Sequence, residues 1–329
     1  MRLNIIGAGG WGTALATILS ANGLEPTLWV RERETADTIN NTHENSAFLP
    51  GVTLSKSIRV VNDLAAAAGA PVLVLAVPTQ YIRETVKKNV ALFEGKIIIN
   101  VAKGIECGTG LRVSQILREA AGITPENYVV LTGPSHAEEV ARNTPTAVVA
   151  ASENQEAVKI AQEAFSTASF RVYSGDDVIG AEIGGAVKNI IAIAAGIIDG
   201  LEIGDNAKAA LITRGLAEMS RLGAALGADV RTFAGLSGLG DLIVTCDSRH
   251  SRNRRVGEEI GRGKQLPAIL SEMRSVAEGV WTTESVLALA DSLGVEMPIA
   301  AQVGDILFRN KSPRAAIIEL MTRETRSEN

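Results

Sequence analysis

The sequence is poor in the residues that hold disulfide scaffolds and metal sites together. Among 329 residues there are two cysteines, Cys107 and Cys246, and three histidines. The cysteines are far apart and lack metal-ligand spacing, which argues against a disulfide framework and gives no indication of a metal site. We therefore expect no bound metal, interpret both cysteines as packing residues, and place the protein in the reducing cytoplasm.

The sequence also lacks an excess of positive charge. Lysine and arginine number 32 against 37 aspartate and glutamate residues, so the formal net charge is −5. A nucleic-acid-binding protein needs a basic face, and none is indicated here. With 46% hydrophobic and 21% charged residues, the composition is that of a well-packed globular enzyme.

The sequence contains no long hydrophobic run that is free of charge. Near the N-terminus, Gly7 interrupts the apolar residues before a signal-peptide core of about 7–15 residues can form, so export is not expected. Residues 179–198 are rich in Gly, Ala and Ile but include Glu182, Lys188 and Asn189. Because one charge at a bilayer centre costs roughly 2.5–3.5 kcal/mol, we predict a buried helix of a soluble core and not a membrane span.

The first half of the chain alternates short β-branched runs with amphipathic segments. This pattern predicts an α/β fold with a Rossmann-like, doubly wound, mostly parallel sheet that forms a dinucleotide-binding domain over residues 1–175. The predicted helices include 11–22, 79–92 and 111–121. The predicted strands are 3–6, 27–30, 72–77, 96–101, 128–131, 147–151 and 170–173.

The second half lacks such strand runs. Beyond about Asp176, long segments rich in Ala, Leu and Glu are separated by glycine-rich turns, which predicts an all-α C-terminal substrate-binding domain over residues 176–329. Its first helix is expected at residues 177–198. Since no flexible linker separates the halves, we expect the domains to pack together, and the apolar helical domain is compatible with a homodimer.

A glycine-rich turn follows the first predicted strand. Residues 7–12 read Gly-Ala-Gly-Gly-Trp-Gly and open a predicted helix, the context in which this pattern indicates dinucleotide binding. Gly7 suits the tight turn, Gly9 lets the backbone approach a pyrophosphate, and Gly12 lets helix and strand pack closely. The anion would then lie at the helix N-terminus. The alternative is a glycine-rich turn without a ligand.

The end of the second predicted strand bears on the choice of cofactor. An acidic residue there binds the adenosine ribose of NAD, whereas an arginine accommodates the extra phosphate of NADP. The sequence has Arg31-Glu32-Arg33 at this point. We favour NADP over NAD, with Arg31 as the phosphate ligand and Arg33 as its helper. The alternative is that both arginines are solvated and Glu32 binds the ribose.

Lys188 is the first candidate for proton transfer. Its neighbours three and four positions away on the predicted helix are glycine, isoleucine and alanine, so the side chain rises from small and apolar surroundings. A lysine desolvated there has a lowered pKa and can act as a general base near neutral pH. The alternative is a lysine that extends to solvent or pairs with Glu182.

A second glycine-rich turn lies in the helical half. Residues 235–240 are followed by Asp241 and then by Thr245. Asp241 can orient Lys188 or bind a substrate hydroxyl. The alternative is a helix N-cap, a position that aspartate favours.

A short basic run follows this turn. Residues 248–255 contain four arginines in an otherwise acidic chain. The planar guanidinium group suits phosphate, and Ser251 and Asn253 add neutral donors around Arg252. A nucleic-acid patch would use similar chemistry, but one short run without a basic face elsewhere argues against it.

The sheet half contributes two further polar positions. Lys103 follows the predicted strand that ends at Val101, and Gly133 to Ser135 follow the one that ends at Leu131. Ligands of open α/β folds bind at the carboxyl ends of parallel strands, so both positions are candidates for the site.

Six short motifs occur in one order along the chain. They are Gly-Ala-Gly-Gly-Trp-Gly-Thr-Ala-Leu-Ala at 7–16, Lys-Gly-Ile-Glu at 103–106, Gly-Pro-Ser at 133–135, Ala-Val-Lys-Asn at 186–189, Gly-Leu-Gly-Asp-Leu at 238–242 and Ser-Arg-Asn at 251–253. Together they closely resemble the bacterial-type NAD(P)-dependent glycerol-3-phosphate dehydrogenases. The resemblance covers nearly the whole chain, and the order of the motifs is more specific than any one of them.

This resemblance implies a reaction and a set of roles. The enzyme would move a hydride between NAD(P)H and dihydroxyacetone phosphate, supplying the glycerol phosphate backbone of phospholipids. Lys188 would be the proton acceptor, with Lys103 and Asp241 beside it. Substrate would also be held by Gly133, Ser135, Asn189, Thr245, Arg252 and Asn253. The nucleotide would be lined by Gly10, Trp11, Arg31, Lys103, Ala137, Arg252 and Glu278.

Two other classes of protein share parts of this pattern. A dehydrogenase of a sugar acid or 3-hydroxy acid would have the sheet domain and a helical lysine. It would not account for the motifs at 238–242 and 251–253 together. A non-catalytic dinucleotide sensor would need a DNA-recognition helix or a basic domain, which the sequence does not indicate.

Overall fold

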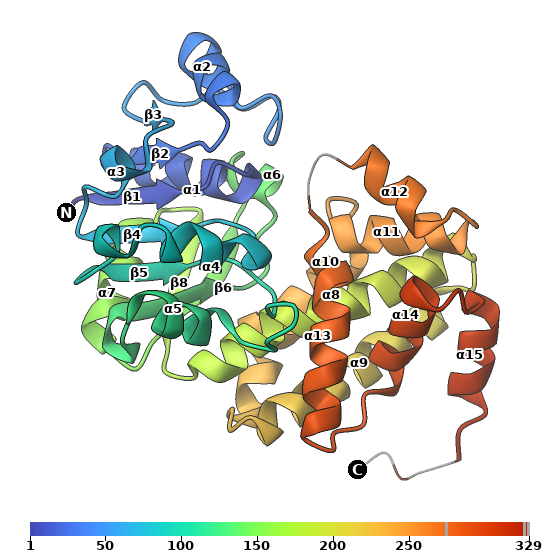
Figure 1. The fold of residues 1–329 in the computed structure, drawn as a ribbon. Coiled ribbons are helices and arrows are strands. Elements are labelled where there is room, and N and C mark those ends of the chain that lie inside the picture. Colours follow the sequence, from blue (N-terminus) through green and yellow to red (C-terminus); the bar gives the residue numbers. More distant parts are fainter. Residues whose placement is uncertain (274–275, 325–326, 328–329) are drawn as a thin grey trace.

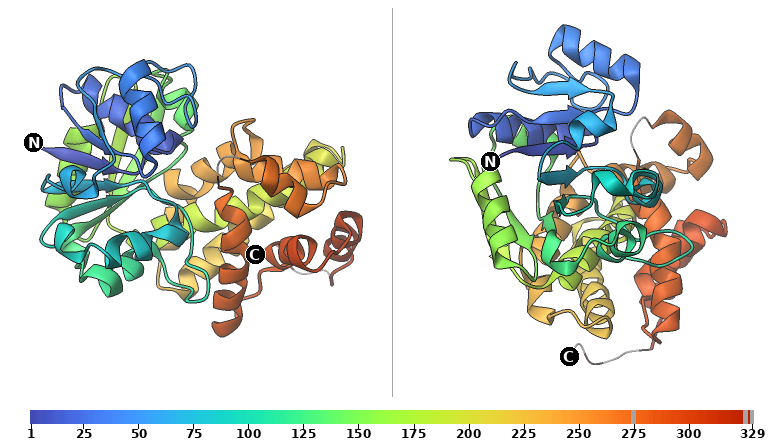
Figure 2. Two further views of the ribbon diagram at one scale, coloured as in Figure 1. Left: turned by 45° about the horizontal axis from the view of Figure 1, so that its top comes forward. Right: turned by 60° about the vertical axis from the view of Figure 1, so that its left-hand side comes forward.

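The computed structural model describes residues 1–273, 276–324 and 327. A sheet with helices on both faces packs directly against a body of helices (Figure 1), and the left view of Figure 2 also shows the two side by side. The described strands form one sheet in the order β3-β2-β1-β4-β5-β6-β7-β8. Their bounds are β1 Leu3–Ile6, β2 Thr27–Trp29, β3 Arg59–Val61, β4 Val72–Leu75, β5 Ile97–Asn100, β6 Tyr128–Thr132, β7 Thr146–Ala151 and β8 Phe170–Gly175.

The strands run parallel with one exception. β6 and β7 pair antiparallel, so β1 to β6 end at one edge of the sheet, while β7 and β8 run the other way. The predicted doubly wound, mostly parallel sheet is confirmed. The sequence patterns do not predict β3, because this edge strand has three residues and begins with the exposed Arg59.

Alternate residues of the strands feed two apolar cores. Val74 of β4 packs into the core shared with α1 (Gly10–Ala21) and α7 (Gln155–Phe165). Its neighbour Leu75 packs into the core shared with α4 (Thr79–Lys87) and α5 (Val113–Ala121). Helices therefore cover both faces of the sheet. Shorter or peripheral elements of this half are α2 Arg33–Thr42, α3 Leu64–Ala67, α6 Ala137–Val140 and the 3-10 turns η1 Val90–Leu92 and η2 Pro125–Asn127.

The helical body is built around α8 (Val178–Gly200). Every residue from Gly180 to Ile198 is buried. The helix is long and apolar enough to cross a membrane by length and composition, but the helices around it bury its whole apolar stretch inside the fold. The predicted core helix is confirmed. The surrounding elements are α9 Asp205–Ala225, η3 Val230–Ala234, η4 Leu236–Gly240, α10 Asp241–Asp247, α11 Arg252–Gly261, α12 Leu266–Glu272, α13 Glu278–Ser292, α14 Pro298–Phe308 and α15 Pro313–Met321.

Glycines let α11 approach α8 backbone to backbone. A methyl group on Gly196 of α8 would overlap the carbonyl oxygen of Arg254, and one on Gly257 of α11 would overlap that of Ile193. This close crossing fixes α11 along α8 and brings the N-terminal residues of α11 beside the middle of α8.

Glu182 of α8 anchors the helical body to the sheet domain. Its carboxylate accepts hydrogen bonds from Arg112, from the amide and hydroxyl of Ser114, and from the hydroxyl of Tyr128, at 2.6–2.8 Å. A buried charge with this many partners is fully satisfied, so it fixes where α8 starts relative to the sheet.

The two cysteines differ in their surroundings. Cys246 is buried, but Cys107 is exposed. The prediction that both are packing residues is therefore wrong for Cys107, which lies in a turn between β5 and α5 with its Sγ 3.4 Å from the carbonyl oxygen of Trp281.

Candidate active site

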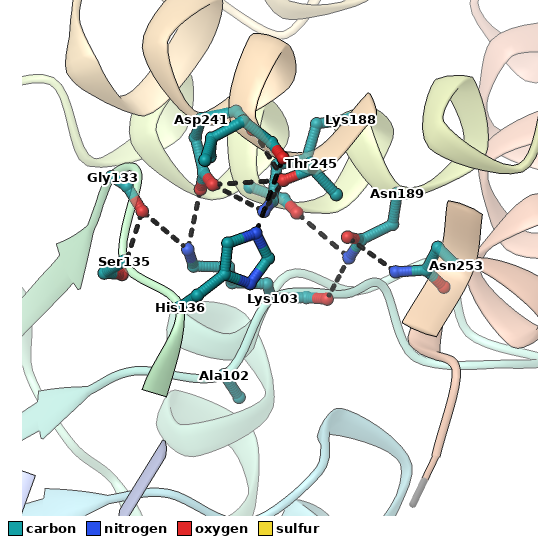
Figure 3. A network of polar contacts seen from close by, with 12 residues as sticks. Ala102, Lys103, Gly133, Ser135, His136, Lys188, Asn189, Asp241, Thr245 and Asn253 are labelled. Carbon is teal, nitrogen blue, oxygen red and sulfur yellow. Dashed lines mark hydrogen bonds and ion pairs between the residues drawn. The ribbon is translucent and has the colours of Figure 1, made fainter. Parts of the chain in front are cut away.

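Two lysines share one buried carboxylate where the sheet domain meets the helical body (Figure 3). Nζ of Lys188 lies 2.6 Å from Oδ1 of Asp241, and Nζ of Lys103 lies 2.6 Å from Oδ2 of the same residue. Lys188 also donates to Oγ1 of Thr245 at 2.7 Å. These side chains come from α8, from the loop after β5 and from α10, so the fold brings the predicted catalytic residues together.

The charges in this cluster set its protonation. Burial lowers the pKa of Lys188 to about 8; the Asp241 carboxylate opposes this shift, and the Lys103 charge adds to it. Burial alone would raise the pKa of Asp241, but the two ammonium groups outweigh burial and lower it. Asp241 therefore stays ionised, while Lys188 can exist in both forms near neutral pH and can accept or donate a proton.

The structure decides between the alternatives stated for Lys188 and for Asp241. The Lys188 side chain is 6% exposed and pairs with Asp241, whereas Glu182 is held by other groups. Gly240, not Asp241, is the N-cap of α10. A methyl group on Gly184 would overlap the carbonyl oxygen of Ser237, so this glycine lets the π-helical turn η4 pack on α8 and deliver Asp241 to the lysines.

The loop after β6 closes one side of the cluster. Gly133, with φ of 142°, has a conformation that a side chain would strain, and its carbonyl oxygen accepts a hydrogen bond from Nζ of Lys103 at 3.0 Å. The hydroxyl of Ser135 donates to the same carbonyl at 2.9 Å. Both predicted positions thus lie beside Lys103.

Two asparagines extend the site along α8. Nδ2 of Asn253 donates to Oδ1 of Asn189 at 2.9 Å, and Asn189 in turn donates to the carbonyl oxygen of Lys103 at 3.2 Å. Oδ1 of Asn253 accepts from the amide of Gly279 at 2.9 Å. The amides therefore tie α8, α11, α13 and the loop after β5 together around Lys188.

The N-terminus of α11 presents Arg252, a cation whose side chain has no partner among the described residues. Ser251 is the N-cap, and its hydroxyl accepts from the amide of Arg254 at 3.2 Å, so this predicted substrate donor already has a structural use. Arg252, the next residue, is exposed. Within the described residues its side chain makes no hydrogen bond or ion pair, which leaves its guanidinium group available to an anion.

The glycine-rich turn has the shape expected of a dinucleotide site. Gly7 has φ of 114°, and a methyl group on Gly12 would overlap the Gly7 carbonyl oxygen. Nothing lies within 4 Å of a methyl group placed on Gly9, so the turn is open there. Helix α1 has no side-chain cap, which leaves its N-terminal amides to an anion. Ala137 faces Gly10 across this opening, with 3.7 Å between its Cβ and a methyl group placed on Gly10, and Trp11 packs on Phe170.

Sequence reasoning missed two histidines at the rim of the cluster. Nε2 of His136 lies 3.4 Å from the carbonyl oxygen of Val244, and the ring centroid of His136 is 5.9 Å from that of His250. The position of His136 directly after the Gly-Pro-Ser motif was the one sequence feature that could have pointed to it. The contact between His136 and His250 joins segments far apart in the sequence. Across the described parts of the chain, no three His, Cys, Asp or Glu side chains form a group that could hold a metal ion.

Comparison with known proteins places these features in a family. A family model for the N-terminus of NAD-dependent glycerol-3-phosphate dehydrogenase matches residues 2–158, and the model for its C-terminus matches residues 177–318. The chain belongs to the NAD-dependent glycerol-3-phosphate dehydrogenase family. The resemblance found in the sequence motifs is thereby confirmed.

Individual members of the glycerol-3-phosphate dehydrogenase family match over the full length. A glycerol-3-phosphate dehydrogenase [NAD(P)+] of Chlorobium phaeobacteroides is 53% identical over 332 residues, covering 100% of this chain and 99% of the relative. The crystal structure of the Coxiella burnetii glycerol-3-phosphate dehydrogenase superposes with a TM-score of 0.94 at 39% identity, covering 98% and 99% of the two chains. The Plasmodium falciparum glycerol-3-phosphate dehydrogenase superposes with a TM-score of 0.88 at 25% identity, covering 99% and 97%.

The residues that bear on cofactor choice in this glycerol-3-phosphate dehydrogenase lie at the surface. Nε of Arg31 is 2.6 Å from Oε1 of Glu32, and its guanidinium carbon lies 5.8 Å from the ring centroid of Tyr81. Arg33 begins α2 with its side chain 84% exposed. Arg31 and Glu32 are therefore paired with each other, and either can turn to an incoming ribose or phosphate.

Glu278 links the helical body to the sheet domain. Its Oε1 accepts from the amide of Thr79 at the start of α4, at 3.0 Å. Its Oε2 and the hydroxyls of Thr79 and Thr282 are buried without hydrogen-bond partners, and all three lie within 3.1 Å of a methyl group placed on Gly104. Burial raises the pKa of Glu278 to about 7.

We expect Glu278→Gln to change how stability depends on pH. The raised pKa means that the folded chain binds this proton more tightly than the unfolded chain, so the contribution to stability is full below pH 4.5 and is lost as pH rises through about 7. Glutamine keeps the bond to Thr79 without titrating. Above pH 8 the variant should melt about 3–6 °C higher than the parent, or ~1–2 kcal/mol, and the difference should shrink toward pH 5.

Thermal unfolding of the cofactor-free enzyme at pH 5.5, 7 and 8.5 measures this difference. Glu218, whose pKa is also raised to about 7, is unchanged in both proteins, so both should retain some loss of stability with pH. If the melting temperatures of parent and variant change by the same amount across these pH values, the assignment to Glu278 is wrong.

Proposed function

We propose that this chain interconverts dihydroxyacetone phosphate and sn-glycerol 3-phosphate with NAD(P)H, and that Lys188 carries the proton. The reaction is that of the family to which the chain belongs. The observation that supports the residue assignment is the buried Lys188, paired with an ionised Asp241, at the carboxyl edge of the sheet. We further propose that the product supplies the backbone of glycerophospholipids.

The arrangement suits a direct transfer. The glycine-rich turn, with its open Gly9 and uncapped helix, fits a pyrophosphate, and a bound nicotinamide would supply or accept the hydride. During reduction, the Lys188 ammonium group donates a proton to the oxygen of the former ketone. During oxidation, neutral Lys188 takes the hydroxyl proton from the same oxygen. Asp241 keeps Lys188 oriented and stabilises the ammonium form.

The remaining residues divide between the two ligands in this proposal. Arg252 binds the substrate phosphate and can also reach the nucleotide, while Asn253, Asn189 and Thr245 orient the substrate. Lys103, Gly133 and Ser135 also contact the substrate. The nucleotide is lined by Gly7, Gly9, Gly10, Trp11, Gly12, Arg31, Arg33, Lys103, Ala137 and Glu278.

We also propose a setting for the enzyme. The chain divides into a dinucleotide-binding domain over residues 1–175 and a substrate-binding domain over residues 176–329, with β8 ending at Gly175 and α8 beginning at Val178. It acts in the cytoplasm, and a homodimer is its proposed assembly. Sedimentation of the purified chain tests the last point.

Assays of both reaction directions and of alternative substrates test the function. Purified protein should oxidise NADPH when dihydroxyacetone phosphate is added, and should reduce NADP+ or NAD+ with sn-glycerol 3-phosphate. Sugar acids and 3-hydroxy acids should give no turnover. Binding of NADPH without turnover of any of these substrates would favour the sensor alternative.

Arg31→Asp tests the preference for NADP. If Arg31 binds the adenosine phosphate, the variant should lose at least about tenfold in kcat/KM for NADPH and much less for NADH, because a hydrogen bond to a charged group contributes about 1.5–3 kcal/mol. Steady-state kinetics with both cofactors measures the ratio. Equal losses for NADPH and NADH would show that Arg31 does not select the cofactor.

A further inference from the structure

Lys188 is almost closed off from water even though no ligand covers it. Its side chain is 6% exposed, and its hydrogen bonds go to Asp241 and Thr245, which are themselves buried. Each turnover in the proposed function changes the protonation of this amine once. Before the next cycle a proton must therefore reach Lys188 from solvent or leave it.

His136 lies beside the cluster that contains this amine, and His250 lies next to His136. The charges of Lys188, Asp241 and Lys103 all act on the pKa of His136. Figure 3 shows it on the side of the cluster formed by the loop after β6. His250, in the loop between α10 and α11, lies beside His136, with 5.9 Å between the two ring centroids. Both histidines are partly exposed.

We propose that His136, assisted by His250, relays the proton between Lys188 and solvent. After oxidation of substrate, the Lys188 ammonium group gives one proton to the neutral imidazole of His136. The imidazolium then gives that proton to water or to a buffer base, and Lys188 is left neutral. Reduction uses the same steps in reverse. Lys188 and His136 are not hydrogen-bonded to each other, so the hydroxyl group of a water molecule or of the substrate bridges them.

The electrostatics of the rim suit this role. Burial lowers the pKa of His136, and the charges of Lys188 and Lys103 add to the effect, while Asp241 and the contact with Val244 oppose it. The ring is therefore neutral at pH 7. Nε2 lies 3.4 Å from the Val244 carbonyl oxygen, which favours the tautomer protonated on Nε2 in the resting ring.

A competing route would run through Asp241 to Lys103, whose side chain is 18% exposed. That route needs Asp241 to hold the proton in transit. Both lysines lower the pKa of this carboxyl, so its protonated form is strongly disfavoured. The histidine route uses a group that titrates closer to neutral pH.

His136→Asn tests the relay through its response to buffer. A positioned proton-transfer group contributes typically 10²–10⁴-fold, and a relay that acts through Lys188 should contribute less, so kcat should fall about tenfold in dilute buffer. Added imidazole should restore most of the loss, while the KM for dihydroxyacetone phosphate changes little. The parent enzyme should not respond to imidazole.

His43→Asn is the matched control. His43 is the remaining histidine of the chain and ends α2 with φ of 53°, a conformation that asparagine tolerates. This variant should match the parent. His250→Asn should show a smaller loss that imidazole also relieves, and it keeps the relay testable if His136→Asn does not fold.

Two results would overturn the relay. One is a His136→Asn enzyme with the parent kcat in dilute buffer, and the other is a loss that imidazole does not relieve, which would show a structural role. Failure of the proposed function is distinguishable, because the parent enzyme itself would then not turn over dihydroxyacetone phosphate.

Discussion

Arg252→Ala should reduce kcat/KM for dihydroxyacetone phosphate by about 30- to 4,000-fold. Removing a charged, hydrogen-bonded anchor costs roughly 2–5 kcal/mol of transition-state binding. Arg252 is exposed and unpaired within the described residues, so its side chain contributes little to the fold and is free for a phosphate. The melting temperature should therefore stay close to that of the parent. Steady-state kinetics and thermal unfolding provide the two measurements.

A substrate without the phosphate makes this test specific. With dihydroxyacetone in place of its phosphate ester, the parent and Arg252→Ala should differ little, because the contact is already missing. Arg255→Ala is the matched control, since Arg255 is also exposed on α11 but lies further along the helix. An equal loss with both substrates would assign Arg252 to the cofactor or to the fold instead of the phosphate.

Local patterns predicted the scaffold well. The turn at Gly7, the strands predicted from short β-branched runs and the core helix containing Lys188 are each determined by residues close in the sequence. β3 was missed because three edge residues carry too little pattern. The segment predicted as one helix over 79–92 divides into α4, which ends at Lys87, and a separate 3-10 turn.

Contacts between distant segments were less predictable. The sequence suggested that Asp241 could orient Lys188, but the bridge to a second lysine, Lys103, depends on packing between residues 138 positions apart. Likewise, nothing near Glu278 indicates that it caps α4 in the other domain. Such contacts follow from the tertiary arrangement, so only a motif resemblance could point to these residues in advance.

Lys188→Ala should lower kcat by at least about 10²–10⁴-fold, the contribution of a positioned acid–base group, and more if the amine also orients the substrate. Asp241 retains its bond to Lys103 at 2.6 Å, so the buried carboxylate keeps a partner and the variant should fold. NADPH binding should survive, because the glycine-rich turn lies in the other domain. In the parent, the rate of oxidation should rise as pH passes about 8 and the rate of reduction should fall, following the Lys188 pKa.

Lys188→Arg separates proton transfer from charge. Arginine keeps a cation beside Asp241 but cannot readily release a proton at neutral pH. If Lys188 only balances charge, the arginine enzyme should retain much of the parent activity. If Lys188 transfers the proton, the arginine enzyme should be nearly as slow as Lys188→Ala, and the pH dependence near 8 should disappear from its residual activity. Near-parental turnover, with circular dichroism showing an intact fold, would move the proton carrier elsewhere. Lys103 would then be the next residue to replace, because it shares the Asp241 carboxylate with Lys188.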